Sequence, residues 1–304
     1  MRYIFLLLFF CSSIRCERAI TYEFNGGRFG DCLSTYCKAK WFAYKHKLKL
    51  FYKPFTYSDQ LTMHNIESVY GDPIAQSFDK IVKVKNEADI INNKDKHVLF
   101  VSNFYSQTPG LYEYGIQDVQ FAQEIKKALT PTIPMPTIEK PHDSIIAAVH
   151  IRKGGGFDQP LASEQIYKKN EQYADQIWPT KFPPDQYYID QIKVLKNIIG
   201  CNTPLTIYLL TDDPDPAALA AKYTQKLNNP LISFIFRDKD NSHNSNVVED
   251  FYIMAQCDCL IRSSSLFAKA AQLLGNHTII IYPISGKWAD GKVIIDPVGI
   301  TIRA

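Results

Sequence analysis

The chain has 304 residues, of which 46% are hydrophobic and 21% charged, which excludes a disordered chain and leaves room for two domains. The net charge of +3 is spread among acids, so nucleic acid is not an expected partner. Residues 1–16 combine a basic start, an apolar run and a small-residue exit, typical of a secretory signal peptide. That run is much shorter than the roughly 20 residues of a membrane span, so no stable span is expected. We expect a lumenal or secreted protein of the secretory pathway, and the alternative is a cytoplasmic protein with an apolar first strand.

The first half of the chain alternates β-rich runs with amphipathic helical patterns, which predicts an α/β domain over residues 17–140. Strands are expected at 20–24, 48–52 and 97–102, and helices at 31–46 and 119–129. Four prolines between Pro131 and Pro141 exclude regular structure there and predict a linker.

The second half, residues 141–304, repeats the alternation. Strands are expected at 145–151, 205–210, 232–236, 259–261 and 278–282, and helices at 184–199, 216–227, 246–256 and 266–274. This succession is typical of a doubly wound parallel sheet, in which ligands lie beyond the carboxyl ends of the strands. We therefore expect the chemistry just after the strands, at 26–30, 152–156, 212–213 and 263–265.

Two glycine-rich turns suit an anion. His150, Arg152 and Lys153 stand just before three glycines at 154–156, so a strand delivers cations and backbone N–H groups to one point. Gly27 and Arg28 lie in a second such turn, which opens a helix and can cradle a phosphate. The alternative for each is a plain tight turn at the surface.

Acids and hydroxyls follow the later strands. Asp212 and Asp213 close an apolar strand, and the alternative for Asp213 is the N-cap of the next helix. Asp250 belongs to an amphipathic helix that leads to a short strand. Three serines at 263–265 then begin another helix, where hydroxyls and N–H groups converge on a site suited to phosphate. No Cys-x-x-Cys or histidine pair indicates a metal site.

The ordered set of His-x-Arg-Lys, Thr-Asp-Asp, an Asp-bearing helix, a Cys-Asp turn, a short strand and Ser-Ser resembles the GDP-fucose-dependent α1,2-, α1,6- and protein O-fucosyltransferases. The Gly-Gly-Arg-Phe-Gly-Asp turn at 26–31 is similar to that superfamily's Gly-Arg-Leu-Gly-Asn turn. The likeness covers most of residues 145–275 and the first turn. It implies an α/β fold of GT-B type, with two Rossmann-like domains facing across a cleft.

The resemblance also implies an inverting, metal-independent glycosyltransferase without a cofactor, which transfers fucose from GDP-fucose to a hydroxyl of a glycan or glycoprotein. The alternative is a catalytically inactive relative that binds a nucleotide sugar or a glycan. In the active enzyme Arg152 would contact the donor's diphosphate, with Lys153 in place of the family's second arginine. The general base would be Asp158 or, less favoured, Glu164, and the alternative for both is a solvated loop acid. The other donor-binding residues implied are Gly27, Arg28, His150, Tyr187, Asp212, Asp213, Asp250, Ser263, Ser264 and Ser265.

Overall fold

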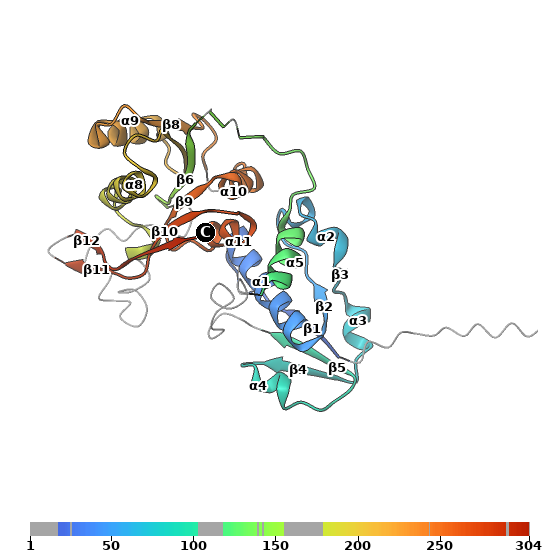
Figure 1. Ribbon diagram of the computed structural model, residues 1–304. Coiled ribbons are helices and arrows are strands. Elements are labelled where there is room, and N and C mark those ends of the chain that lie inside the picture. The colour runs from blue at the N-terminus through green and yellow to red at the C-terminus, as the bar shows by residue number, and fades with distance from the viewer. Residues whose placement is uncertain are drawn as a thin grey trace, which may run out of the picture.

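The computed structural model of the chain contains two α/β units, each built on its own β-sheet (Figure 1). It describes residues 18–24, 26–102, 118–138, 140–141, 143–154, 179–242, 244–289 and 292–303. The signal peptide expected at 1–16 lies outside these residues. The two-unit α/β architecture confirms the expected fold class, and residue 140 falls in the stretch between the two sheets.

The first sheet is parallel, with the strand order β3-β2-β1-β5-β4. Its central strand is buried from Ala19 to Tyr22, as is usual for a parallel sheet whose faces are both covered. The sheet contains β1 (Arg18–Tyr22), β2 (Lys49–Tyr52), β3 (Ser68–Val69), β4 (Lys80–Val84) and β5 (Val98–Ser102). Its two long helices are α1 (Phe29–His46) and α5 (Val119–Leu129), and between the strands lie α2 (Met63–Ile66), α3 (Asp72–Gln76), α4 (Ala88–Ile91) and a 3₁₀ turn (Ser58–Gln60).

The second sheet has the order β13-β10-β9-β6-β7-β8 and is parallel except for β13, which pairs antiparallel with β10. The strands are β6 (Ile145–Ile151), β7 (Leu205–Thr211), β8 (Ile232–Phe236), β9 (Cys259–Arg262), β10 (Ile279–Pro283) and β13 (Val298–Ile302). A separate hairpin joins β11 (Gly286–Ala289) to β12 (Lys292–Ile295). The helices are α8 (Asp185–Ile199), α9 (Pro216–Leu227), α10 (Val247–Gln256) and α11 (Leu266–Leu274).

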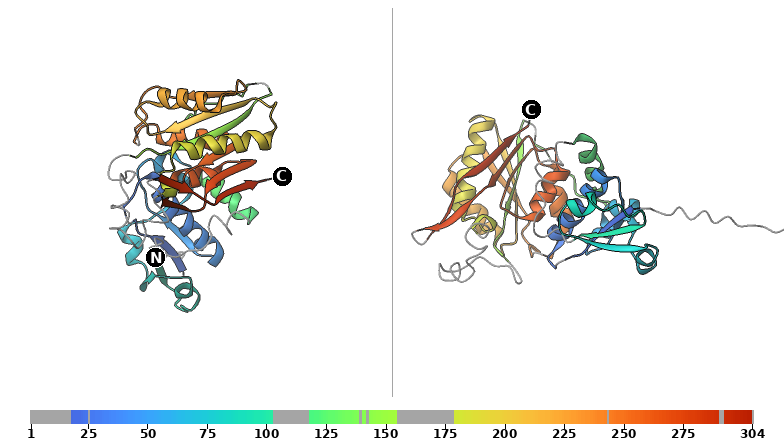
Figure 2. Two further views of the ribbon diagram at one scale, coloured as in Figure 1. Left: turned by 90° about the vertical axis from the view of Figure 1, so that its left-hand side faces the viewer. Right: turned by 90° about the horizontal axis from the view of Figure 1, so that it is seen from below.

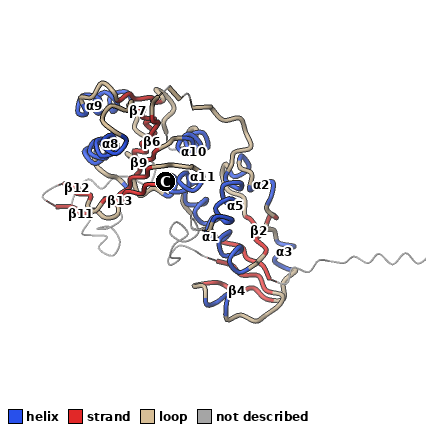
Figure 3. Tube along the Cα trace, viewed as in Figure 1, coloured by secondary structure: helices blue, strands red, loops and turns tan. Residues whose placement is uncertain are grey.

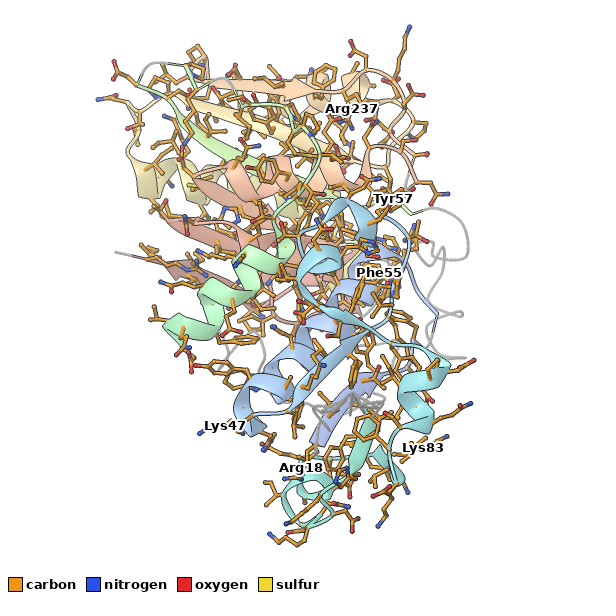
Figure 4. The ribbon with its side chains drawn as sticks, turned by 90° about the vertical axis from the view of Figure 1, so that its right-hand side faces the viewer. Arg18, Lys47, Phe55, Tyr57, Lys83 and Arg237 are labelled. Atoms are coloured by element: carbon orange, nitrogen blue, oxygen red, sulfur yellow. The ribbon has the colours of Figure 1, made fainter. Side chains whose placement is uncertain are left out.

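The two units share an apolar core. Helix α1 packs against α11, and buried residues of the first sheet, α1, α10, α11 and the second sheet belong to one cluster. Figures 1 and 2 show these helices between the two sheets, with α8 and α9 on the outer face of the second sheet. Figure 3 shows the stretch from α5 to β6 as loop, as its prolines predict. Residues Phe55 and Tyr57 lie on the side of the first unit that faces the second, whereas Arg18 and Lys83 lie at its far end (Figure 4).

Candidate functional site

A cavity of about 840 Å³ lies between the two units. One wall is the start of α1 with the loop after β2. The other wall is formed by the ends of β6 and β7 and by the starts of α10 and α11. The cavity therefore lies where a doubly wound sheet places its ligand, and its size is typical of a small-molecule site.

Glycines shape the turn that opens α1. Gly27 has a φ of 91°, and a Cβ placed there would stand 2.6 Å from the Cβ of Asp31. A Cβ on Gly30 would stand 2.4 Å from the backbone nitrogen of Phe267, at the start of α11. Because both positions exclude a side chain, the starts of α1 and α11 meet, backbone against backbone, at one edge of the cavity.

Three helices begin at the cavity. Their first residues Phe29 of α1, Val247 of α10 and Leu266 of α11 all line it. The first N–H groups of a helix have no partner within the helix and carry part of its positive pole. Ser265 occupies the N-cap position of α11, but its hydroxyl makes no capping hydrogen bond, and it lines the cavity together with Ser264. This wall suits an anion.

Asp212 holds the basic turn after β6. Its carboxylate accepts hydrogen bonds from the backbone N–H groups of Lys153 at 2.6 Å and Gly154 at 3.2 Å. The turn places Arg152 on the cavity wall, with the guanidinium over the ring of Phe182 at 5.3 Å. The acid thus holds the turn by accepting from two consecutive backbone N–H groups that directly follow Arg152.

His150 and Asp250 also line the cavity. Burial lowers the pKa of His150 to about 4, with Arg262 acting in the same direction and Asp212 against it, so the imidazole is neutral at pH 7. Burial raises the pKa of Asp250 to about 6, although Arg237 opposes this with an ion pair of 2.7 Å. A neutral imidazole and a hydrogen-bonded carboxylate are suited to polar groups of a nucleoside.

The cavity residues that were not assigned to the site from the sequence include Lys38, Tyr57, Lys181 and Lys269. Lys38 stands seven residues after Asp31 on α1, and Lys269 four residues after Ser265 on α11, so helical spacing was the available signal for both. The other two, Tyr57 and Lys181, carried no such signal. In the described part of the chain the cavity wall has five cations and three carboxylates: Arg28, Lys38, Arg152, Lys181 and Lys269 against Asp31, Asp212 and Asp250.

Two expected donor-binding residues point elsewhere. The ammonium of Lys153 forms an ion pair of 2.5 Å with the carboxylate of Asp185 at the start of α8, and Lys153 does not line the cavity. Tyr187 is buried in the core behind the second sheet, and its hydroxyl donates to the carbonyl of Arg262 at 3.2 Å. Neither residue lines the cavity, because each side chain is held by an internal partner, and a contact of either one with the donor stays a prediction.

Two more expected donor-binding residues, Ser263 and Asp213, do not line the cavity. Ser263 is fully buried below the serine pair that lines the cavity. Asp213 does not line the cavity and does not cap the next helix either, because its carboxylate accepts from the backbone N–H of Asp215 at 2.9 Å. Asp215 is the N-cap of α9, since Pro216 occupies the first helical position. The candidate bases Asp158 and Glu164 lie outside the described residues.

Gly27, Arg28, His150, Arg152, Asp212, Asp250, Ser264 and Ser265 are the expected donor-binding residues that one cavity brings together. Within the described ranges, no group of three His, Cys, Asp or Glu residues has a geometry that could hold a metal ion. The same ranges contain no helix whose length and apolarity would suffice to cross a membrane.

No protein-family model matches the chain, and no curated protein matches it significantly. A crystal structure of POFUT1 in complex with GDP-fucose is 14% identical with a TM-score of 0.46, over 87% of this chain and 96% of that one. An arginine-to-lysine mutant of Arabidopsis thaliana FUT1 in complex with GDP is 11% identical with a TM-score of 0.49, over 86% and 70%. NodZ fucosyltransferase from Bradyrhizobium is 12% identical with a TM-score of 0.44, over 95% and 99%. The first of these structures holds GDP-fucose, the second holds GDP, and the third is named a fucosyltransferase.

Proposed function

We propose that the chain is an inverting, metal-independent glycosyltransferase that transfers fucose from GDP-fucose to a hydroxyl of a glycan or glycoprotein. The observation that carries the proposal is the meeting of the Arg152 turn, Asp250 and the Ser264–Ser265 helix start in one cavity between two α/β units. These residues come from three separate β-α junctions, and the sequence motif that resembles fucosyltransferases consists of the same junctions.

The charge on the leaving group accounts for the cations. When the bond between the anomeric carbon and the diphosphate breaks, negative charge develops on GDP. The guanidinium of Arg152, the N–H groups that begin α11 and the hydroxyls of Ser264 and Ser265 are already in place to receive it. Arginine suits this role because its planar fork binds two phosphate oxygens at once. We propose that these groups perform the work that a divalent cation does in metal-dependent transferases.

The nucleoside end of the donor is assigned to two other residues of the cavity wall. We propose that neutral His150 and the carboxylate of Asp250 bind the base or ribose, since Arg237 and burial hold Asp250 in a fixed position. Asp212 then acts as a positioning residue, because both of its hydrogen bonds go to the turn that carries Arg152.

Calorimetry and donor turnover test this proposal together. GDP and GDP-fucose are expected to bind, GDP-mannose more weakly, and GDP-fucose to be turned over. Arg152→Ala is expected to reduce turnover by roughly 10²–10³-fold, the usual loss on removing one preorganised donor, without a change in the far-UV circular dichroism spectrum. Lys83→Ala removes a cation at the far end of the first unit and is the control. Binding without turnover by the wild type would point to the inactive relative, and no nucleotide binding would refute both readings.

The place of action follows from the expected signal peptide. We propose that the chain enters the secretory pathway, where a lumenal transferase meets both its donor and its acceptor. Expression in a eukaryotic secretory host and N-terminal sequencing of the product test this, with cleavage expected before Glu17. An intact N-terminus on a protein retained in the cytoplasm would refute it.

A further inference from the structure

One short segment, residues 180–185, contacts both places to which the diphosphate is assigned, the Arg152 turn and the serine pair at 264–265. The segment lies between β6 and β7 in the chain and leads into α8. Two of its residues, Phe182 and Asp185, do not line the cavity. The segment thus joins two parts of the site that are far apart in the sequence.

The backbone of Thr180 holds the serine pair. Its carbonyl accepts from the backbone N–H of Ser264 at 2.8 Å. Thr180 is 3% exposed, so this hydrogen bond lies in a region of low dielectric constant, where it is stronger than at the surface. Ser264 and Ser265 both line the cavity. The position of the pair is therefore tied to the 180–185 segment.

Two consecutive side chains of the basic turn contact the same segment. The guanidinium of Arg152 lies over the ring of Phe182 at 5.3 Å, and this ring is 8% exposed. The ammonium of the next residue, Lys153, forms its 2.5 Å ion pair with Asp185. Prolines at 183–184 separate the two contacts, and a proline ring fixes φ. The covalent chain therefore restricts the spacing between the ring and the carboxylate.

Asp185 is itself held from the other side by α9. Its carboxylate accepts from the ammonium of Lys222 at 2.6 Å and from the hydroxyl of Tyr223, a buried residue, at 3.1 Å. Burial opposes the ionisation of Asp185, but the hydrogen bonds from Lys153 and Lys222 hold its pKa below the usual value, so it is charged at neutral pH. Lys153 is thus bound to a charged carboxylate in a fixed position.

We infer that the 180–185 segment sets the position of Arg152 relative to the serine pair, and that Asp185 is a positioning residue that acts through Lys153. The inference rests on the proposed function. Preorganised donors stabilise the charge on a leaving diphosphate when they stand in the right places before it leaves. Asp212 ties the backbone of the basic turn to the end of β7, whereas Asp185 ties a side chain of the turn to the segment that also holds the serine pair. The two links are therefore not redundant.

A double-mutant cycle tests the inference. Asp185→Asn removes the negative charge, Lys153→Met removes the ammonium, and the double variant removes both. Isothermal titration calorimetry measures the affinity for GDP and for guanosine, and a second assay measures GDP release from GDP-fucose with water as the acceptor. Each single variant is expected to bind GDP about tenfold more weakly and to release GDP roughly 10–10²-fold more slowly, because a small misplacement of Arg152 is amplified in the rate. The double variant is expected to lose no more than either single variant, because both changes break the same contact.

Guanosine separates positioning from a merely structural role. It lacks the diphosphate, so its affinity is expected to stay within about twofold of wild type in all three variants. Asp190→Asn is the matched control, because Asp190 also lies on α8, accepts from the side chain of Gln186 at 2.8 Å and does not line the cavity. It is expected to leave both affinities unchanged. Phe182→Leu removes the ring under Arg152, is expected to weaken GDP binding in the same way, and tests the inference by itself if Asp185→Asn does not fold.

The inference is overturned if Asp185→Asn binds GDP as tightly as the wild type does. It is also overturned if GDP and guanosine lose affinity equally, or if the losses of the two single variants multiply in the double variant. If Lys153→Met alone weakens GDP binding, Lys153 contacts the donor itself and the positioning role is wrong. A wild type that binds no GDP refutes the proposed function instead.

Discussion

At the scale of single residues, Asp212 shows how one side chain governs a turn. Replacing it by alanine leaves the N–H groups of Lys153 and Gly154 without their acceptor, at a cost of about 1–3 kcal/mol in unfolding free energy. Because the same turn carries Arg152, GDP affinity is expected to fall by about tenfold or more. Chemical denaturation and calorimetry measure the two effects. Asp213→Ala is the control, since that neighbour does not line the cavity, and equal losses in both variants would contradict the role given to Asp212.

His277 predicts how stability depends on pH. Its ring is fully buried with Nδ1 against the carbonyl of Cys257 at 2.9 Å, and burial lowers its pKa from 6.5 to about 4. Between these values the unfolded chain binds more protons, so stability decreases as the pH falls from about 6.5 to about 4, by up to about 3 kcal/mol for this group. His150 acts in the same sense, and Asp250, whose pKa is raised to about 6, acts in the opposite sense.

Urea unfolding at pH 7.0 and 5.0 measures this dependence. His277→Asn is expected to reduce the difference between the two pH values, whatever its effect on absolute stability. His46→Asn, at a histidine 2.8 Å from Glu87 and outside the buried cluster, provides a comparison. An unchanged difference in His277→Asn would show that the ring is not buried in its neutral form.

At the scale of elements, Gly30 fixes how α1 meets α11. A methyl group there would stand 2.4 Å from the backbone nitrogen of Phe267, and a helix backbone cannot move aside as a side-chain tip can. We expect Gly30→Ala to cost about 1–3 kcal/mol in unfolding free energy, the usual range for overpacking, and to weaken GDP binding because two helix starts are pushed apart. Gly71→Ala is the control, since its nearest neighbour would be 3.7 Å away. A Gly30 variant as stable as this control would contradict the contact.

The elements also show what the sequence could predict. In the second half, 145–151, 216–227, 232–236 and 266–274 were predicted with their observed ends, because long apolar periods and Gly, Pro or Asp signals mark them. The sequence analysis predicted no elements between residues 58 and 95, since α2, α3 and α4 are about one turn long and β4, at a sheet edge, carries two lysines without regular alternation. The other strands were identified by their alternation with helices. No helix separates β11, β12 and β13, so this signal was absent there.

The candidate site divides in the same way. Residues directly after strands, such as Arg152 and Asp212, could be predicted because a parallel sheet brings its carboxyl ends together. The orientation of side chains could not, and this is why Lys153 and Tyr187 were expected in the cavity. Lys181 also lines the cavity, near Asp31 and Arg28 of the first unit, and no local pattern in the sequence places it there.

At the scale of the whole molecule, the shared core predicts that both units unfold together. Phe29 begins α1, is 6% exposed, and its ring centroid lies 6.1 Å from those of Phe55 and Tyr57 in the first unit. It lies 5.7 Å from Phe251 and 6.2 Å from Phe267 in the second. Removing the ring takes contacts from both units at once, so Phe29→Ala is expected to cost about 3–5 kcal/mol.

Differential scanning calorimetry distinguishes a molecule that unfolds as one cooperative unit from one whose two units unfold separately. The wild type is expected to melt in a single transition whose calorimetric and van't Hoff enthalpies agree, and Phe29→Ala to lower its midpoint without splitting it. Phe78→Ala removes a ring from a cluster on the first sheet alone. It is expected to lower the midpoint of the same single transition, because α1 of the first unit shares a core with α10 and α11 of the second. Two resolved transitions, with Phe78→Ala moving just one of them, would contradict a common core. The cavity would then lie between two bodies free to move, and the meeting of the starts of α1 and α11 at its edge would lose its structural basis.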